Sequence, residues 1–303
     1  MNRVLIALRI AALATAATMA VAAMAEQRTF PTPQAAMDGL TTALSAKDRA
    51  GVLAIFGDEY ADFLTGGDEA AARVEWRNVM ELAKEATVLR PDGDGRYIAV
   101  LGRRAWPMPI PIVEDTGAWR FDTAAGIEEV TNRRIGRNEL AAMEFARKYV
   151  EAQRQYASVD RTGNEVLKYA QKLRSTPGLK DGLFWESASG EATSPLAPFA
   201  AERSEFLAGR DEGDPYLGYY YRILTKQGAD APGGAYDYVI NGNMIAGFAL
   251  IAWPADYGNS GIMTFMISHQ GKLLQKDLGP DTEKVAAAID AYDPDSSWTE
   301  PRD

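Results

Sequence analysis

The second half of the chain alternates short apolar runs with tight turns, and this pattern limits the possible folds more than any other feature. In the run LGYYYRILTK, Tyr219, Tyr221 and Ile223 fall on one face of a strand because alternate residues point to opposite sides. Two further strand-like runs follow at 233–254 and 261–279, broken at Asn241-Gly242 and at the turn His269-Gln270-Gly271. The links are too short for helical crossovers, so we expect an antiparallel sheet.

A long amphipathic helix precedes this sheet. Residues 132–160 read NRRIGRNELAAMEFARKYVEAQRQYASVD. The apolar and aromatic residues of this segment recur at spacings of three and four, namely at Ala142, Phe145, Tyr149, Ala152 and Tyr156. One face of the helix is therefore predicted to pack on the sheet, whereas charged residues keep the other face in water.

The first half shows the reverse order, with helices before strands. Three helical segments are expected at 33–48, 49–56 and 67–86, with Thr29 or Thr32 capping the first and Asp68 capping the third. Strand-like runs follow at 87–91, 96–103, 106–113 and 118–123. We therefore predict an α+β protein with two domains, helices plus a β-meander at 26–135 and a long helix on an antiparallel sheet at 136–303.

The helices-then-meander order of 26–135 resembles the small cone-shaped domains of the nuclear-transport-factor-two type. Such domains often hold a ligand between helices and sheet, although fold alone does not assign the function. Trp106, Trp119 and Phe121 could line a pocket of this kind, and the favoured alternative is that they fill the core. Glu114 and Asp115 are interpreted as a polar hairpin tip because neighbours on a strand face opposite sides.

The segment 139–285 resembles the globular head of type IV pilins and type II secretion pseudopilins. The matching features are Gly218-Tyr219, Ala252-Trp253-Pro254, Gly258 to Gly261, Thr264-Phe265 and Gly271. Pilins carry an apolar N-terminal helix that continues into the head helix and drives polymerisation. Here the first domain occupies that position, so a free head is expected instead of a pilus subunit.

The whole mature chain resembles a secreted bacterial family catalogued as domain of unknown function 2950. The phrases that carry this resemblance are GYYYRILTKQG, GGAYDYVINGNMIAGFALIAWPADYG and QKDLGPDT. The resemblance implies no activity.

The first 25 residues have the pattern of a secretory signal peptide. Arg3 and Arg9 supply positive charge, an alanine-rich apolar stretch covers 10–23, and Ala23-Met24-Ala25 fits signal peptidase. Cleavage between Ala25 and Glu26 is expected to deliver the chain to the periplasm or beyond, with no membrane span afterwards. The chain contains no cysteine, so burial and not disulfide bonding must stabilise it.

Composition narrows the classes of function. The formal charge is −10, with 42 acidic against 32 basic residues, and so acidic a chain repels nucleic acid. With no cysteine and a single histidine, a zinc site of the usual ligands is not expected. Asp290, Asp293 and Asp295 lack the glycine and glutamate of a calcium loop and are interpreted as a solvated tail. A calcium or magnesium site built only from oxygen ligands stays open, but we predict neither a metal nor a cofactor.

No catalytic residue is predicted. His269 is interpreted as an exposed turn residue, because no oriented partner accompanies it. Ser260 lacks the full Gly-x-Ser-x-Gly spacing of a nucleophile elbow.

These features favour a non-catalytic envelope protein that binds a protein partner or a small ligand. The alternatives are a carboxylate-based hydrolase acting on envelope glycans and an accessory protein of a pilus or secretion system. Aromatic residues crowd the second half and are predicted to form the binding surface: Tyr219, Tyr220, Tyr221, Tyr236, Tyr238 and Trp253. The ligand, the partner and the oligomeric state stay open.

Overall fold

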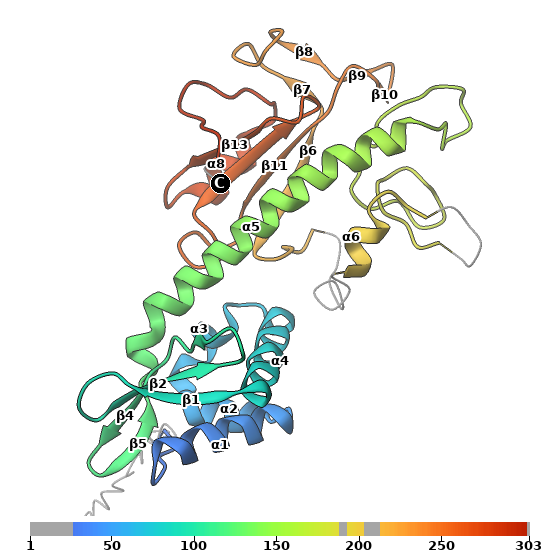
Figure 1. Cartoon of the computed structure of the whole chain (residues 1–303). Coiled ribbons are helices and arrows are strands. Elements are labelled where there is room, and N and C mark those ends of the chain that lie inside the picture. Colours follow the sequence, from blue (N-terminus) through green and yellow to red (C-terminus); the bar gives the residue numbers. More distant parts are fainter. Residues whose placement is uncertain (1–26, 188–192, 203–212, 302–303) are drawn as a thin grey trace, which may run out of the picture.

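A computed structural model describes residues 27–187, 193–202 and 213–301 of the chain (Figure 1). The predicted signal peptide and its cleavage site lie outside these residues. Among the described residues, helices and antiparallel strands occur in the order expected from the sequence, which confirms the α+β class.

The N-terminal unit begins with helices and ends with a meander. Its elements are α1 (Pro33–Ser45), α2 (Arg49–Phe56), η1 (Asp58–Tyr60), α3 (Ala61–Thr65), α4 (Glu69–Glu85), β1 (Thr87–Pro91), β2 (Arg96–Leu101), β3 (Trp106–Pro107), β4 (Ile112–Asp115) and β5 (Ala118–Phe121). Thr32 caps α1 by accepting the Ala35 N–H at 3.0 Å, and Asp68 caps α4 by accepting the Ala70 and Ala71 N–H groups at 3.1 and 3.0 Å.

The N-terminal sheet has the strand order β1-β2-β4-β5, with β3 paired to the end of β2. Every pair is antiparallel, as the turn chemistry predicts. Glu114 and Asp115 are exposed at the tip of the β4–β5 hairpin, which confirms their interpretation. Phe121 is fully buried, and Trp119 is half-buried with its backbone paired to Phe30.

A single helix, α5 (Thr123–Ala157), links the two halves of the molecule (Figure 1). It begins earlier than predicted because Asp122 accepts the Ala125 N–H and the Thr123 hydroxyl donates to the Phe56 carbonyl at 2.6 Å. Gly126 also lies directly against Ile110, where a Cβ atom would stand 2.6 Å from the Ile110 Cγ1 atom. Tertiary contacts with the N-terminal unit therefore extend the helix beyond its amphipathic stretch.

The C-terminal unit places α5 against a four-stranded antiparallel sheet in the order β13-β12-β11-β6. Its elements are α6 (Ala197–Glu202), β6 (Tyr219–Leu224), β7 (Lys226–Gln227), β8 (Tyr236–Asp237), β9 (Val239–Ile240), β10 (Asn243–Met244), β11 (Ala249–Pro254), β12 (Met263–Ser268), β13 (Leu273–Asp277) and α8 (Thr282–Ala288). The Tyr149 hydroxyl donates to the Ala249 carbonyl at 3.2 Å and so ties α5 to β11.

Buried apolar residues form two clusters, and α5 takes part in both. The first cluster draws on residues between Phe30 and Phe121, with Val130 of α5 packed against it. The second begins at Ala142 on α5 and extends to Tyr292. The predicted domain boundary between 135 and 136 therefore falls inside a continuous helix, in the stretch between its two contacts. Within the described residues, no helix is both long enough and apolar enough to span a membrane.

Candidate functional site

A cavity of about 500 Å³ lies where α5 passes from one unit to the other. Its walls come from α1, α2, α3, α4, the segment after β3 and the first half of α5, and its C-terminal side is closed by residues 217–218 and Ser260. Most of the lining is apolar: Leu40, Leu44, Val52, Phe56, Leu64, Ala71, Ala72, Trp76, Val79, Trp106, Met108, Pro109, Ile110, Val130, Leu140, Ala141 and Leu217. We call this cavity the junction pocket.

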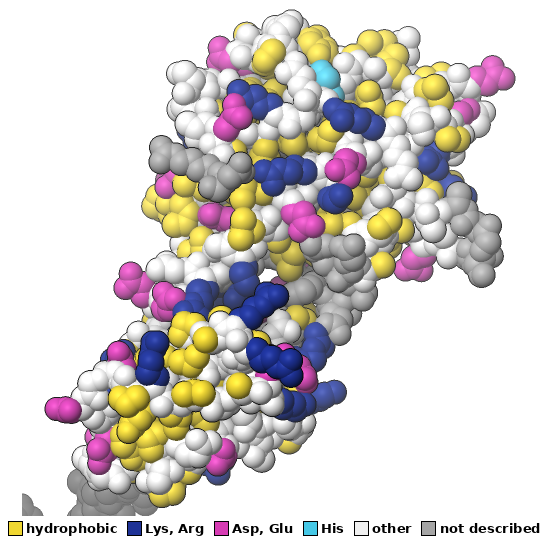
Figure 2. All heavy atoms as spheres, viewed as in Figure 1, with side chains coloured by type: hydrophobic (Ala, Val, Ile, Leu, Met, Phe, Trp, Pro, Cys, Tyr) yellow, Lys and Arg dark blue, Asp and Glu magenta, His cyan; other side chains and the backbone are white. Residues whose placement is uncertain are grey.

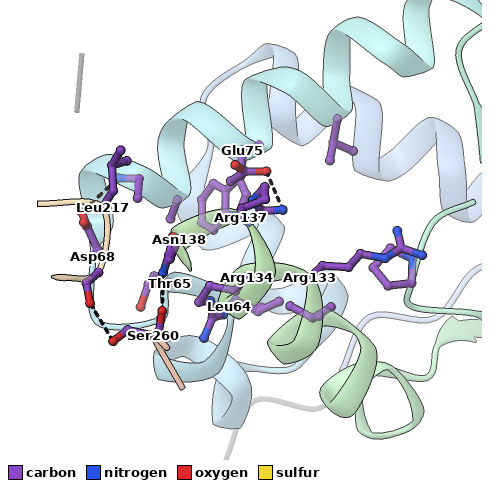
Figure 3. Close-up of a pocket in the computed structure, with 18 of the residues that line it drawn as sticks. Leu64, Thr65, Asp68, Glu75, Arg133, Arg134, Arg137, Asn138, Leu217 and Ser260 are labelled. Carbon is purple, nitrogen blue, oxygen red and sulfur yellow. Dashed lines mark hydrogen bonds and ion pairs between the residues drawn. The ribbon is translucent and has the colours of Figure 1, made fainter. Parts of the chain in front are cut away.

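Three arginines of α5 line the junction pocket, and Figure 3 shows Arg137 pointing to Glu75 of α4. Arg133 donates to the Pro107 carbonyl at 2.8 Å and to Glu129 at 2.6 Å, and its guanidinium lies over the Trp106 ring at 5.1 Å. Basic side chains also gather on the displayed face at the junction of the two units (Figure 2). The pocket thus combines an apolar interior with charged side chains at its rim.

Arg134 bridges the two units through neutral oxygens. It donates to the Phe63 carbonyl of α3 and to the Asn259 side-chain oxygen of the β11–β12 loop. Burial lowers the pKa of Arg134, and the positive charge of Arg137 acts in the same direction. Gly66 makes room for this guanidinium, because a Cβ atom there would stand 2.6 Å from the Arg134 Cζ atom.

Arg137 forms an ion pair with Glu75 of α4 across the mouth of the junction pocket (Figure 3). The two charged atoms are 3.4 Å apart, and half of the Arg137 side chain is exposed. The lining also includes the carboxylates of Asp68 and Glu144. Asp68 is already engaged as the cap of α4.

Further contacts fix α5 to the C-terminal sheet beside the junction pocket. Asn138 donates to the Ser260 carbonyl at 2.8 Å, and one Glu139 oxygen accepts the Ile262 and Met263 N–H groups at 3.0 Å each. Ser260 is buried, and its hydroxyl donates to the Gly218 carbonyl at 2.8 Å. Ser260 therefore holds the loop in place.

The predicted aromatic surface is divided between the core and a second cavity. Tyr219 and Tyr238 are fully buried, so the structure corrects their assignment to an exposed surface. Tyr219 donates to the Met263 carbonyl at 2.9 Å, and Tyr238 donates to the Gln227 side chain at 2.9 Å. Both rings belong to the hydrophobic core of the C-terminal unit. The alternation of side chains along a strand does not show which face of the strand other elements cover. Tyr236 is 37% exposed beside Tyr238.

Tyr220, Tyr221 and Trp253 line the second cavity, of about 610 Å³, which we call the aromatic pocket. It lies at the edge strand β6, so side chains from both faces of that strand reach it. Tyr221 packs against Phe145 of α5 with ring centroids 4.4 Å apart, and Tyr220 packs against Trp253 at 5.7 Å. Whether these three residues bind a partner stays a prediction.

His269 lies at the predicted turn after β12, but it is half-buried and not exposed. Its ring packs edge-on against Tyr238 and Phe248, and burial lowers its pKa. The His269 ring therefore contributes to packing beside the turn.

The aspartates near the C-terminus have separate partners. Asp290 pairs with Lys226 at 2.9 Å, Asp293 accepts the Asp230 N–H at 2.7 Å, and Asp295 accepts the Ser297 N–H at 2.8 Å. No group of three or more histidine or acidic residues that could hold a metal ion occurs in the described parts of the chain. The aspartates do not converge on one point.

The predicted functional residues do not include the arginines at the junction pocket. Arg133, Arg134 and Arg137 belong to the run RRIGR, which lies in the segment predicted to form the long helix. Three arginines within five residues of a helix bordering on a predicted ligand-holding domain would have been the available signal. Their convergence with Glu75 and Gly66 depends on contacts distant in sequence.

The fold and this cavity together define a two-part α+β protein with an apolar pocket at the junction of its parts. The chain belongs to a family described as protein of unknown function (DUF2950), whose family model matches residues 27–300. No curated protein and no solved structure matches it significantly.

Proposed function

We propose that this protein is an exported, non-catalytic binding protein that holds a small, largely apolar ligand in the junction pocket. The single observation that carries the proposal is the cavity of about 500 Å³ with a mainly apolar lining. Ligand pockets of proteins commonly have such volumes and linings, with few polar groups that orient the ligand. The signal-peptide pattern of residues 1–25 supports export to the periplasm.

The packing at the junction supports binding without large rearrangement. Asn138, Glu139 and Arg134 tie α5 to the loops that close the pocket. A preformed site loses less conformational entropy when a ligand enters. In the N-terminal unit, α1, α2, α3, α4, Trp106 of β3 and the segment that follows β3 provide the inner wall of the cavity.

Filling the pocket tests the proposal directly. Ala141 lines the cavity on α5, and Ala141→Trp would occupy part of the space that a ligand needs. Isothermal titration calorimetry with 1-decanol, a neutral apolar probe, is expected to show binding to the wild-type mature protein and weakening of about tenfold or more in A141W. Gln155→Trp, at an exposed position farther along α5, is the matched control and should bind as the wild type does.

Equal binding of decanol to the wild type and to A141W would place the bound probe elsewhere. Absence of binding to the wild type, with decanol near its solubility limit, would contradict the proposed function itself. Recovery of the protein from the cytoplasm with residues 1–25 intact, as read by mass spectrometry, would contradict the proposed export.

An accessory role in a pilus or secretion system is a second candidate. The packing of α5 along a four-stranded antiparallel sheet favours it, since that order resembles a pilin head. Retention of the protein by a purified secretion or pilus complex, but not by envelope lipids, would support this role.

The hydrolase alternative predicts turnover. Of the carboxylates at the junction pocket, Asp68 caps α4 and Glu75 pairs with Arg137. Shortening of isolated cell-wall glycan fragments by the wild type, lost in both D68N and E75Q, would support the hydrolase and displace the binding role.

A further inference from the structure

Arg134 is a half-buried cation that donates hydrogen bonds to two neutral oxygens, those of the Phe63 carbonyl and the Asn259 side chain. No ion pair to Arg134 is found among the described residues. The negative charges of Asp256 and Glu75 raise the pKa of Arg134 from a distance. A charge removed from water is unfavourable unless an opposite charge or good hydrogen bonds compensate it. Arg134 has these hydrogen bonds but no ion pair among the described residues, so an anion placed beside it would be stabilised.

Arg137 follows one turn later on the same face of α5 and is the more accessible of the two cations. Its ion pair with Glu75 spans 3.4 Å between two partly exposed side chains, and such exposed pairs contribute little to stability. A guanidinium binds a carboxylate best through two parallel N–H···O bonds. An anion with better geometry can therefore take the place of Glu75.

The formal charges of the lining are balanced. The positions of the charged side chains, and not their sum, therefore decide whether the pocket prefers an anionic or a cationic ligand. Asp68, Glu75 and Glu144 line the pocket together with three arginines. Asp68 is engaged at the start of α4, and Asp256 accepts a hydrogen bond from Asn259 at 2.8 Å on the outer side. Arg134 and Arg137 thus form one basic corner beside an apolar interior.

We propose that the junction pocket selects an amphipathic ligand with one carboxylate end, held between Arg134 and Arg137, and with its apolar chain among the side chains of α1, α2 and α4. This assignment rests on the proposed binding function and adds the chemical class of the ligand. Glu75 competes with the ligand for Arg137. The ligand carboxylate also supplies the counter-charge that Arg134 lacks.

Three probes with the same ten-carbon chain test this assignment on the mature protein. Decanoate, 1-decanol and decyltrimethylammonium differ in the charge of one end, and each is titrated by calorimetry below its micelle-forming concentration. Decanoate is expected to bind about tenfold more tightly than decanol, and decyltrimethylammonium more weakly than either. Acetate, which has the head group alone, should not bind measurably.

Two variants change the charge at the mouth in opposite directions. Arg137→Gln should weaken decanoate binding by about fivefold to tenfold and decanol binding by a much smaller factor. Glu75→Gln removes the competitor and should strengthen decanoate binding by about threefold. Arg147→Gln, an exposed position on the same helix and outside the pocket lining, is the control that should change neither.

The outcomes separate the two proposals. Equal affinity for decanoate and decanol would overturn the carboxylate assignment and leave the binding function standing. A loss of decanol and decanoate binding by the same factor in R137Q would also overturn it, because it would show a structural effect. If none of the three probes binds, both the assignment and the proposed function fail.

Discussion

The two halves of α5 share one helix but have opposite surroundings. From Ala142 onward, the helix buries Phe145, Tyr149 and Tyr156 against a sheet and its covering loops. Between Gly126 and Ala142 it has no buried residue, and its arginines border a cavity instead. The second half of α5 therefore contributes to the hydrophobic core, whereas the first half borders the cavity in which we propose that a ligand binds.

The largest effect is expected in the second half of α5, from Ala142 onward. Tyr149→Ala removes a fully buried ring and its hydrogen bond to Ala249, and should lower the free energy of unfolding by about 3–5 kcal/mol. Leu140 lies in the first half of α5 and is 65% exposed, so Leu140→Ala should lower the free energy of unfolding by about 0.5 kcal/mol or less. Urea denaturation followed by circular dichroism measures both, and similar losses would remove the distinction between the halves.

The next largest effect is expected at a buried polar contact in the second half of α5. Gln153 is fully buried and bonds both the Ala170 carbonyl and the Ala170 N–H, each at 2.8 Å. Gln153→Ala leaves both backbone groups unpaired, so the free energy of unfolding should fall by about 2–3 kcal/mol. Hydrogen exchange at Ala170 should speed up in the same variant. An unchanged exchange rate at Ala170 would show that water takes over the hydrogen bonds of the Gln153 side chain.

A pair of adjacent glycines tests the role of the first half of α5, because one of them lies against Arg134. Gly66 and Gly67 both have positive φ, but only at Gly66 would a Cβ atom meet Arg134, because Gly67 has open space around it. Gly66→Ala should cost about 1–2 kcal/mol of stability and weaken decanoate binding, whereas Gly67→Ala should cost about 1 kcal/mol and leave binding intact. Equal effects on decanoate binding would mean that Arg134 does not orient the ligand.

The smallest effect concerns a loop of the C-terminal unit. Burial raises the pKa of Asp181, but hydrogen bonds from Lys172 and Thr176 outweigh burial and hold that pKa at about 2. Because the pKa is lowered in the folded state, the stabilisation is full above the unfolded value near 3.9 and disappears as pH falls through about 2.

Asp181→Asn should therefore lower the free energy of unfolding by about 1 kcal/mol at pH 6, after allowance for solvent screening, and by much less at pH 2. Urea denaturation at the two pH values gives the difference. A loss that is the same at both would show that the Asp181 charge contributes nothing.

The sequence predicts the local elements of this fold well because each depends on nearby residues. The run TVLRP becomes β1, and Thr32 and Asp68 cap the helices expected to follow them. The start of α5 was predicted too late, because Gly126 and Thr123 are fixed by Ile110 and Phe56, which lie elsewhere in the chain.

The candidate site was less predictable, for the same physical reason. Trp106 does line the junction pocket, as one of the two interpretations allowed, but its neighbours there come from five helices and two distant loops. Tyr219 has the alternation of a surface strand, yet its ring is fully buried and packs against Phe265. Periodicity reports the direction of a side chain and not what covers it.

The most direct test of the central claim is a crystal structure of the mature protein with 10-bromodecanoate, in which anomalous scattering locates the bromine atom. The account predicts a bromine peak among the apolar side chains of the junction pocket, with the carboxylate between Arg134 and Arg137. An empty junction pocket, with bromine in the aromatic pocket or only at the surface, would contradict it.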